Sequence, residues 1–181
     1  NIFYLTAILF VFGCSNQNSE PEAVDAEVGS VLLEYMWCDF GSNTSEESLD
    51  KLDVNFSGII LKPNMITPGS VSDKKASSEE IAELTVKCLA NNVPKEVPGI
   101  AFLSGGQSDE DASNNLSNIN KINNNPWKLT FSYGRALQLE AMRKWNGNNQ
   151  NNLEAQKIII KRAQMNALAA SGKYDSSMEN V

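Results

Sequence analysis

The strongest constraint on the fold is a regular alternation of short apolar runs and helix-like stretches from residue 54 onward. Three apolar runs have the length and composition of buried strands, and they are Val54 to Leu61, Gly99 to Leu103 and Trp127 to Ser132. A stretch with apolar residues at helical spacing follows each of them. The order strand, helix, strand, helix, strand, helix with short links predicts an α/β fold whose parallel strands are joined by right-handed crossovers.

The predicted helices have recognisable starts and ends. Ser77 to Glu80 has the pattern of a capping box, and Ser108 to Asp111 opens the next helix with acidic residues that complement the helix dipole rather than form a metal site. The third helix is expected to stop at Gly147, and a last one extends from Leu153 to Ser171. A further amphipathic helix, Ala23 to Trp37, is predicted ahead of the first strand.

Composition excludes several classes of function. The chain has 181 residues, with 22 acidic and 15 basic side chains and a net charge of -7, so it lacks the basic surface that nucleic-acid binding requires. It contains no histidine, which removes the commonest general base, the commonest transition-metal ligand and every Ser-His or Cys-His nucleophilic pair. Any catalysis therefore depends on lysine, carboxylates and backbone groups.

The N-terminal segment has two readings, which the sequence leaves open. The 12 residues 2–13 are almost wholly apolar, too short to span a bilayer but similar in length to a signal-peptide core, and Val11 to Cys14 resembles a lipoprotein cleavage box. No basic residue precedes the run, which argues against a signal peptide, and the same run could equally be a buried strand. Cys14, Cys38 and Cys88 are an odd number at wide spacing, which favours reduced thiols in a cytoplasmic protein. No membrane association is expected.

Residues that could react with or bind a ligand directly follow each predicted strand. Lys62 follows Ile59-Ile60-Leu61, and partial removal of its water favours the neutral amine that attacks a carbonyl. The glycine turn Ser104-Gly105-Gly106 follows the second strand, and Gly134-Arg135 follows the third. The carboxyl ends of parallel strands meet at one edge, so these groups are expected to lie together. An amine, backbone N–H groups before a helix and a guanidinium suit a phosphorylated carbonyl compound.

Three motifs carry a resemblance to a known family. Leu61 to Met65, Pro98 to Ser108, and Pro126-Trp127 with Leu129 to Gln138 together resemble class I fructose-bisphosphate aldolase, the metal-independent, Schiff-base type. The resemblance covers residues 20–174. It implies a partial TIM (β/α)8 barrel, about the last three βα units with a C-terminal helix. Residues 1–19 are then an unmatched segment, and residues 20–181 the C-terminal part of the barrel.

The resemblance implies a reaction. It is the reversible cleavage of fructose 1,6-bisphosphate to dihydroxyacetone phosphate and glyceraldehyde 3-phosphate in glycolysis and gluconeogenesis, without cofactor or metal. Lys62 matches the lysine that forms an iminium with the substrate ketone. Glu20, in Glu20-Pro21-Glu22, matches the glutamate that assists proton transfer, although polar residues 16–19 stand where the family has an apolar strand.

The resemblance also implies a phosphate site. Ser104, Gly105, Gly134 and Arg135 match the positions that bind the C1 phosphate, and Gly106 completes the glycine turn. The expected partners are therefore phosphorylated sugars, and the full-length protein is expected to be a homo-oligomer.

The departures from the family pattern suggest a fragment. Nothing before Glu20 resembles the family, so the first five strands and their aspartate and lysines are not recognised. Three strands of a barrel leave open edges, which favour association. The alternative to an enzyme is thus a non-catalytic remnant that pairs with itself or with an intact aldolase. A lipoprotein anchored at Cys14 is a third hypothesis.

Overall fold

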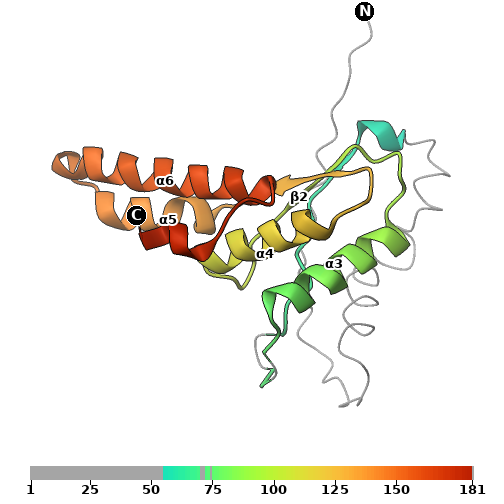
Figure 1. The fold of residues 1–181 in the computed structure, drawn as a ribbon. Helices are drawn as coiled ribbons and strands as arrows, with labels where there is room; N and C mark the ends of the chain where they lie inside the picture. Colours follow the sequence, from blue (N-terminus) through green and yellow to red (C-terminus); the bar gives the residue numbers. More distant parts are fainter. Residues whose placement is uncertain (1–54, 70–71, 74, 181) are drawn as a thin grey trace, which may run out of the picture.

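The computed structural model describes residues 55–69, 72–73 and 75–180, and Figure 1 shows their arrangement. Strands and helices alternate in the order β1 (Ile60–Leu61), α3 (Ser78–Asn92), β2 (Gly99–Phe102), α4 (Asp109–Ile122), β3 (Lys128–Phe131), α5 (Arg135–Trp145) and α6 (Asn152–Ala170). Short 3-10 turns η1 (Phe56–Gly58), η2 (Asn149–Asn151) and η3 (Ser176–Asn180) complete the order. The helix predicted at 23–37, Glu20, Cys14, Cys38 and the boundary at residue 19 lie outside the described residues.

The three strands form one parallel sheet in the order β1-β2-β3, as the alternation predicts. Ile60 pairs with Gly99, and Gly99 in turn pairs with Lys128. The pairing continues beyond the strands, because the N–H of Leu103 donates to the carbonyl of Pro63 at 2.9 Å and that of Ser132 donates to Phe102 at 2.8 Å. The segments that leave the carboxyl ends of the strands therefore start side by side.

The first strand is shorter than predicted. The sequence analysis expected a strand from Val54 to Leu61, but Phe56–Gly58 is a 3-10 turn and β1 contains two residues. The Asn55 side chain accepts hydrogen bonds from the backbone N–H of Ser57 at 3.0 Å and from its hydroxyl at 2.8 Å. Such a local bond offers the backbone an alternative to the sheet ladder, and here it replaces the strand.

The helix boundaries confirm the capping predictions. Ser77 caps α3 by accepting from the N–H of Glu80 at 3.2 Å, and Ser108 caps α4 by accepting from that of Asp111 at 3.0 Å. Helix α5 ends at Trp145, where Asn146 and Gly147 adopt positive φ values of 48° and 70°. A glycine tolerates this left-handed conformation without steric cost, which explains why the helix stops there.

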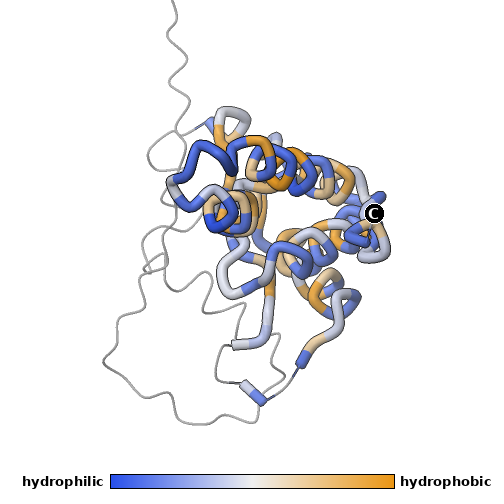
Figure 2. The backbone as a smooth tube through the Cα atoms, turned by 90° about the vertical axis from the view of Figure 1, so that its left-hand side faces the viewer, coloured by the Kyte–Doolittle hydropathy of each residue, from blue (hydrophilic) through white to orange (hydrophobic). Residues whose placement is uncertain are grey.

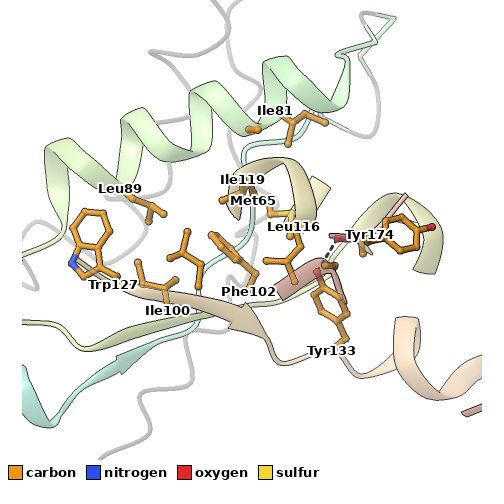
Figure 3. Close-up of a cluster of buried hydrophobic side chains, with 14 of the residues drawn as sticks. Met65, Ile81, Leu89, Ile100, Phe102, Leu116, Ile119, Trp127, Tyr133 and Tyr174 are labelled. Carbon is orange, nitrogen blue, oxygen red and sulfur yellow. Dashed lines mark hydrogen bonds between the residues drawn. The ribbon is translucent and has the colours of Figure 1, made fainter. Parts of the chain in front are cut away.

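The core lies between one face of the sheet and the helices. Ile100 and Phe102 alternate on β2 and are both 0% exposed, and Figure 3 shows them beside Leu116 and Ile119 of α4. The helices alternate between hydrophilic and hydrophobic residues along their length in Figure 2, as expected of elements with one buried face. In the described part of the chain, the other face of the sheet carries Ala101, Lys128 and Thr130, which are half-buried or exposed.

Polar groups of two aromatic residues fix the packing of the core. The indole N–H of the buried Trp127 donates to the carbonyl of Pro94 at 2.8 Å, and the hydroxyl of Tyr133 donates to that of Ala112 at 2.9 Å. These bonds tie the ends of β3 to the loop after α3 and to α4. Among the described residues, no helix has both the length and the apolar character needed to span a bilayer.

Candidate active site at the strand ends

An open cleft of about 1100 Å³ lies at the carboxyl ends of the three strands. Six of the seven residues singled out from the sequence line it: Lys62, Ser104, Gly105, Gly106, Gly134 and Arg135. The seventh, Glu20, lies outside the described residues. The structure thus brings together three segments that are far apart in the sequence, although their individual roles remain predictions.

Lys62 is positioned by the end of β1. It directly follows Leu61, and its side chain is half-buried at the cleft. The next residue, Pro63, accepts the backbone bond from Leu103, so the backbone beside the lysine is held against the start of the glycine turn. Lys62 and the turn therefore border the same cleft.

The glycine turn forms the second wall of the cleft. The N–H of Gln107 donates to the carbonyl of Ser104 at 3.2 Å, and Gly106 has a φ of 78°, which a residue with a Cβ rarely adopts. A Cβ added to Gly105 would lie 2.9 Å from the Leu103 side chain and 3.7 Å from the Asn64 amide. A side chain at 105 would therefore require the end of the Leu103 side chain to shift, whereas Asn64 of the lysine loop would stay at ordinary van der Waals distance.

The start of α5 forms the third wall. Gly134 precedes the helix, so it provides no side-chain hydroxyl or carboxylate to cap the first turn. The N–H groups of Leu137 and Gln138 both donate to its carbonyl at 3.1 Å. Helix N-termini without an acidic cap attract anions through the backbone N–H groups and the positive end of the dipole. Arg135 adds a full positive charge at the same point.

Several cleft residues were missed by the sequence reasoning. Leu139 and Arg143 line the cleft together with the predicted Arg135, and the spacing of four residues places all three on one face of α5. That periodicity was available in the sequence. Asn64 was not recognisable, because its role is to connect segments: its amide nitrogen lies 3.5 Å from the Gly105 carbonyl, and its oxygen accepts from the N–H of Met65 at 2.9 Å.

The charges around the cleft are mixed. Lys62, Arg135 and Arg143 are positive, whereas Asp109 and Glu140 are negative, so the lining carries an excess of positive charge although the chain as a whole carries -7. Within the described ranges, no group of three or more acidic, cysteine or histidine side chains is arranged to hold a metal ion. The lining suits an anionic ligand.

Comparisons with known proteins identify relatives of this chain. A sequence model of the family "Fructose-bisphosphate aldolase class-I" matches residues 43–181. Fructose-bisphosphate aldolase C of Rattus norvegicus is 52% identical over 132 residues, which are 72% of this chain and 36% of that protein. Fructose-bisphosphate aldolase of Plasmodium falciparum is 44% identical over 128 residues, 71% of this chain and 35% of that protein.

A solved structure gives the same result. It is a ternary complex of Plasmodium falciparum fructose-bisphosphate aldolase with TRAP and a small-molecule inhibitor, and it matches with a TM-score of 0.73 and 40% identity over 82% of this chain and 41% of that one. The chain spans little more than a third of the length of the curated relatives it matches. Its parallel βα units are part of an α/β barrel. The chain belongs to the class-I fructose-bisphosphate aldolase family.

Proposed function

We propose that the protein cleaves fructose 1,6-bisphosphate reversibly to dihydroxyacetone phosphate and glyceraldehyde 3-phosphate through an imine on Lys62. One observation carries the proposal: Lys62, the glycine turn and the Gly134-Arg135 pair line the same cleft. An amine beside two phosphate-binding elements suits a phosphorylated ketone. Because the chain spans 36% of a relative's length, substrate binding and turnover need separate tests.

The proposed reaction starts with the neutral amine of Lys62. Its nitrogen attacks the C2 carbonyl of the open-chain sugar, and loss of water leaves a protonated imine. When the C4 hydroxyl loses its proton, the C3–C4 bond breaks, its electron pair moves to the imine, and glyceraldehyde 3-phosphate leaves. Protonation of the resulting enamine at C3 and hydrolysis then release dihydroxyacetone phosphate. Glu20 is proposed to transfer protons during imine formation.

The proposed phosphate site consists of two helix starts. Ser104, Gly105 and Gly106 offer a hydroxyl and backbone N–H groups before α4, and Gly134 and Arg135 offer the uncapped start of α5 and a guanidinium. Charge-assisted bonds to a phosphate are roughly twice as strong as neutral ones. Binding of the C1 phosphate here would hold C2 of the sugar near the amine of Lys62.

Calorimetric titration tests the phosphate site. Dihydroxyacetone phosphate is expected to bind the full chain, whereas uncharged dihydroxyacetone at the same concentration is not. Arg135→Gln should weaken binding by roughly tenfold or more, because one charge-assisted contact contributes about 1.5–3 kcal/mol. Lys144→Gln is the matched control, since Lys144 carries the same charge on the same helix and is absent from the cleft lining. Equal affinities of the two variants would contradict the assignment of Arg135.

A second candidate function is association. Among the described residues, β1 and β3 each pair only with β2, and Ile60 on β1 is 43% exposed. Open strand edges favour pairing with another chain, so we propose as the alternative a non-catalytic remnant that assembles with itself or with an intact aldolase. Sedimentation analysis decides this point, because a stable monomer at all concentrations would exclude self-assembly. Assembly as a homo-oligomer and a cytoplasmic location also belong to the proposal for the whole protein.

A further inference from the structure

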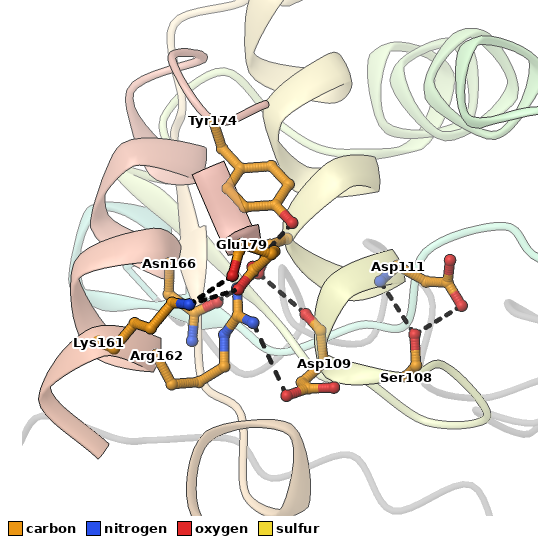
Figure 4. Close-up of polar contacts among 9 residues, drawn as sticks. Ser108, Asp109, Asp111, Lys161, Arg162, Asn166, Tyr174 and Glu179 are labelled. Atoms are coloured by element: carbon orange, nitrogen blue, oxygen red, sulfur yellow. Dashed lines mark hydrogen bonds and ion pairs between the residues drawn. The ribbon is translucent and has the colours of Figure 1, made fainter. Parts of the chain in front are cut away.

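A buried arginine on α6 connects the cleft to the last turn of the chain. Arg162 is 6% exposed, and its guanidinium lies between Glu179 of η3 and Asp109 at the first position of α4 (Figure 4). Lys161 supports the same turn, since its amine donates to the Glu179 carbonyl at 2.6 Å. Asp109 is the member of this cluster that also lines the cleft. One side chain, Arg162, therefore interacts both with a carboxylate of the η3 turn and with a carboxylate at the proposed anion site.

The two carboxylates share this guanidinium unequally. A nitrogen of Arg162 lies 2.7 Å from Glu179 Oε1, which is a short charge-assisted hydrogen bond, whereas the distance from the other terminal nitrogen to Asp109 Oδ2 is 3.7 Å. Tyr174 strengthens the preference, because its hydroxyl donates to the same Glu179 oxygen at 2.9 Å. Glu179 and the Ser113 hydroxyl, which accepts from the same Arg162 nitrogen at 2.9 Å, thus hold the guanidinium at a distance from Asp109 at which no hydrogen bond forms.

We propose that Glu179 regulates the anion affinity of the cleft by competing with Asp109 for Arg162. The inference rests on the proposed phosphate site. The carboxylate of Asp109 repels a phosphate in the cleft to the extent that Arg162 leaves its charge uncompensated. Because the guanidinium and Glu179 are largely shielded from water, with side chains 7% and 11% exposed, solvent and salt screen this pair weakly, whereas the Asp109 side chain is 33% exposed and its charge is screened more strongly. Arg162 is a positioning residue in this account, since it acts through Asp109.

The proposal predicts the direction of two single substitutions. Asp109→Asn removes the repulsive carboxylate and should tighten phosphate binding about three- to tenfold, the order expected for one charge in a partly solvated site. Glu179→Gln releases the guanidinium toward Asp109 and should tighten binding roughly two- to fivefold. Substitution of Arg162 itself is unsuitable, because it would remove the short ion pair of the buried Glu179, leave only Lys161 at 3.9 Å beside that carboxylate, and endanger folding.

The double variant separates competition from simple repulsion. If Glu179 acts through Arg162 and Asp109, then Glu179→Gln should change the affinity less than about 1.5-fold in a chain that already carries Asp109→Asn. Direct repulsion between Glu179 and the ligand would give the same factor in both backgrounds. Glu110→Gln is the matched control, because Glu110 is the neighbour of Asp109 on α4 but does not line the cleft. It should leave the affinity unchanged.

The experiment is a titration of the full chain and its variants with inorganic phosphate, followed by the NMR shifts of the Gly105 and Gly106 amides. Thermal unfolding first establishes that each variant is folded. Tighter binding in both single variants without additivity in the double variant supports the proposal. Phosphate binding that is identical in wild type, Asp109→Asn and Glu179→Gln, or additive in the double variant, overturns it while the proposed function stands. Absence of shifts at both glycines in every variant overturns the phosphate site and this inference together.

Discussion

Replacement of Asn115 by alanine tests how the glycine turn is held in place. Asn115 is 3% exposed on α4, and its amide nitrogen donates to Gln107 Oε1 at 2.8 Å, at the end of the turn. Its oxygen accepts from the Ser78 hydroxyl at 2.7 Å, at the start of α3. A single buried amide on α4 therefore joins the turn that borders the cleft to the first position of α3.

The cost of Asn115→Ala follows from these bonds. Each lost hydrogen bond contributes about 0.5–1.5 kcal/mol, and the abandoned Gln107 oxygen adds about 1–3 kcal/mol if it stays buried without a partner. The Gln107 amide nitrogen is already buried and unpartnered among the described residues. The Gln107 side chain would therefore lose the hydrogen bond that its oxygen accepts from Asn115. Alanine regains about 0.5 kcal/mol of helix propensity. The expected loss of unfolding free energy is about 1.5–5.5 kcal/mol.

Urea unfolding followed by tryptophan fluorescence measures this loss, since Trp127 in the core is 3% exposed. Asn118→Ala is the control on the same helix: it changes propensity equally, but Asn118 only accepts a bond from the exposed Lys121 amine at 3.1 Å. Its effect should stay within about 0.5 kcal/mol. If the two variants unfold at the same urea concentration, the Asn115 bonds do not hold the turn, and the reasoning is refuted.

Three further predictions concern backbone, core and pH. Gly106→Ala should cost about 1 kcal/mol because φ is 78°, whereas Gly134→Ala should be nearly neutral because φ is -93° and a Cβ would meet open space; urea unfolding should separate the two. Leu116→Ala, at 0% exposure, should cost about 2–5 kcal/mol in the same assay, and a loss below about 1 kcal/mol would contradict its place in the core. Burial raises the pKa of the Cys88 thiol from 9.0 to about 11, so the folded state retains the proton longer than the unfolded state does. This contribution to stability is complete below pH 9.0 and is lost as the pH rises toward about 11, and Cys88→Ala should flatten that part of the pH dependence of the unfolding free energy.

The parts of the fold that depend on local chemistry could be predicted from the sequence. The serine caps at Ser77 and Ser108 and the stop at Gly147 follow from side chains within a few residues. The parallel order of the strands follows from the alternation itself, and the meeting of Lys62 with the glycine turn follows from the parallel order. The extent of the first strand could not be predicted, because the local hydrogen bonds that the Asn55 side chain accepts from Ser57 favour a turn there.

Buried polar connections could not be predicted from the sequence. Arg162 stands beside Lys161 in a charged stretch of α6 and has the sequence context of a solvated residue, yet it is buried with Glu179 and Asp109 as partners. Those partners are distant in the sequence, so no local pattern relates them. Asn64 and Asn115 likewise gain their roles only from contacts between segments.

The central claim is that Lys62 forms an imine with a phosphorylated ketone. The chain is incubated with dihydroxyacetone phosphate, reduced with borohydride, digested, and its peptides are weighed by mass spectrometry. The account predicts a reduced adduct on Lys62. Its yield should fall when inorganic phosphate is added, and the adduct should be absent from the Lys62→Arg chain. Labelling that is absent from Lys62, or that persists unchanged in the Lys62→Arg chain, would contradict it.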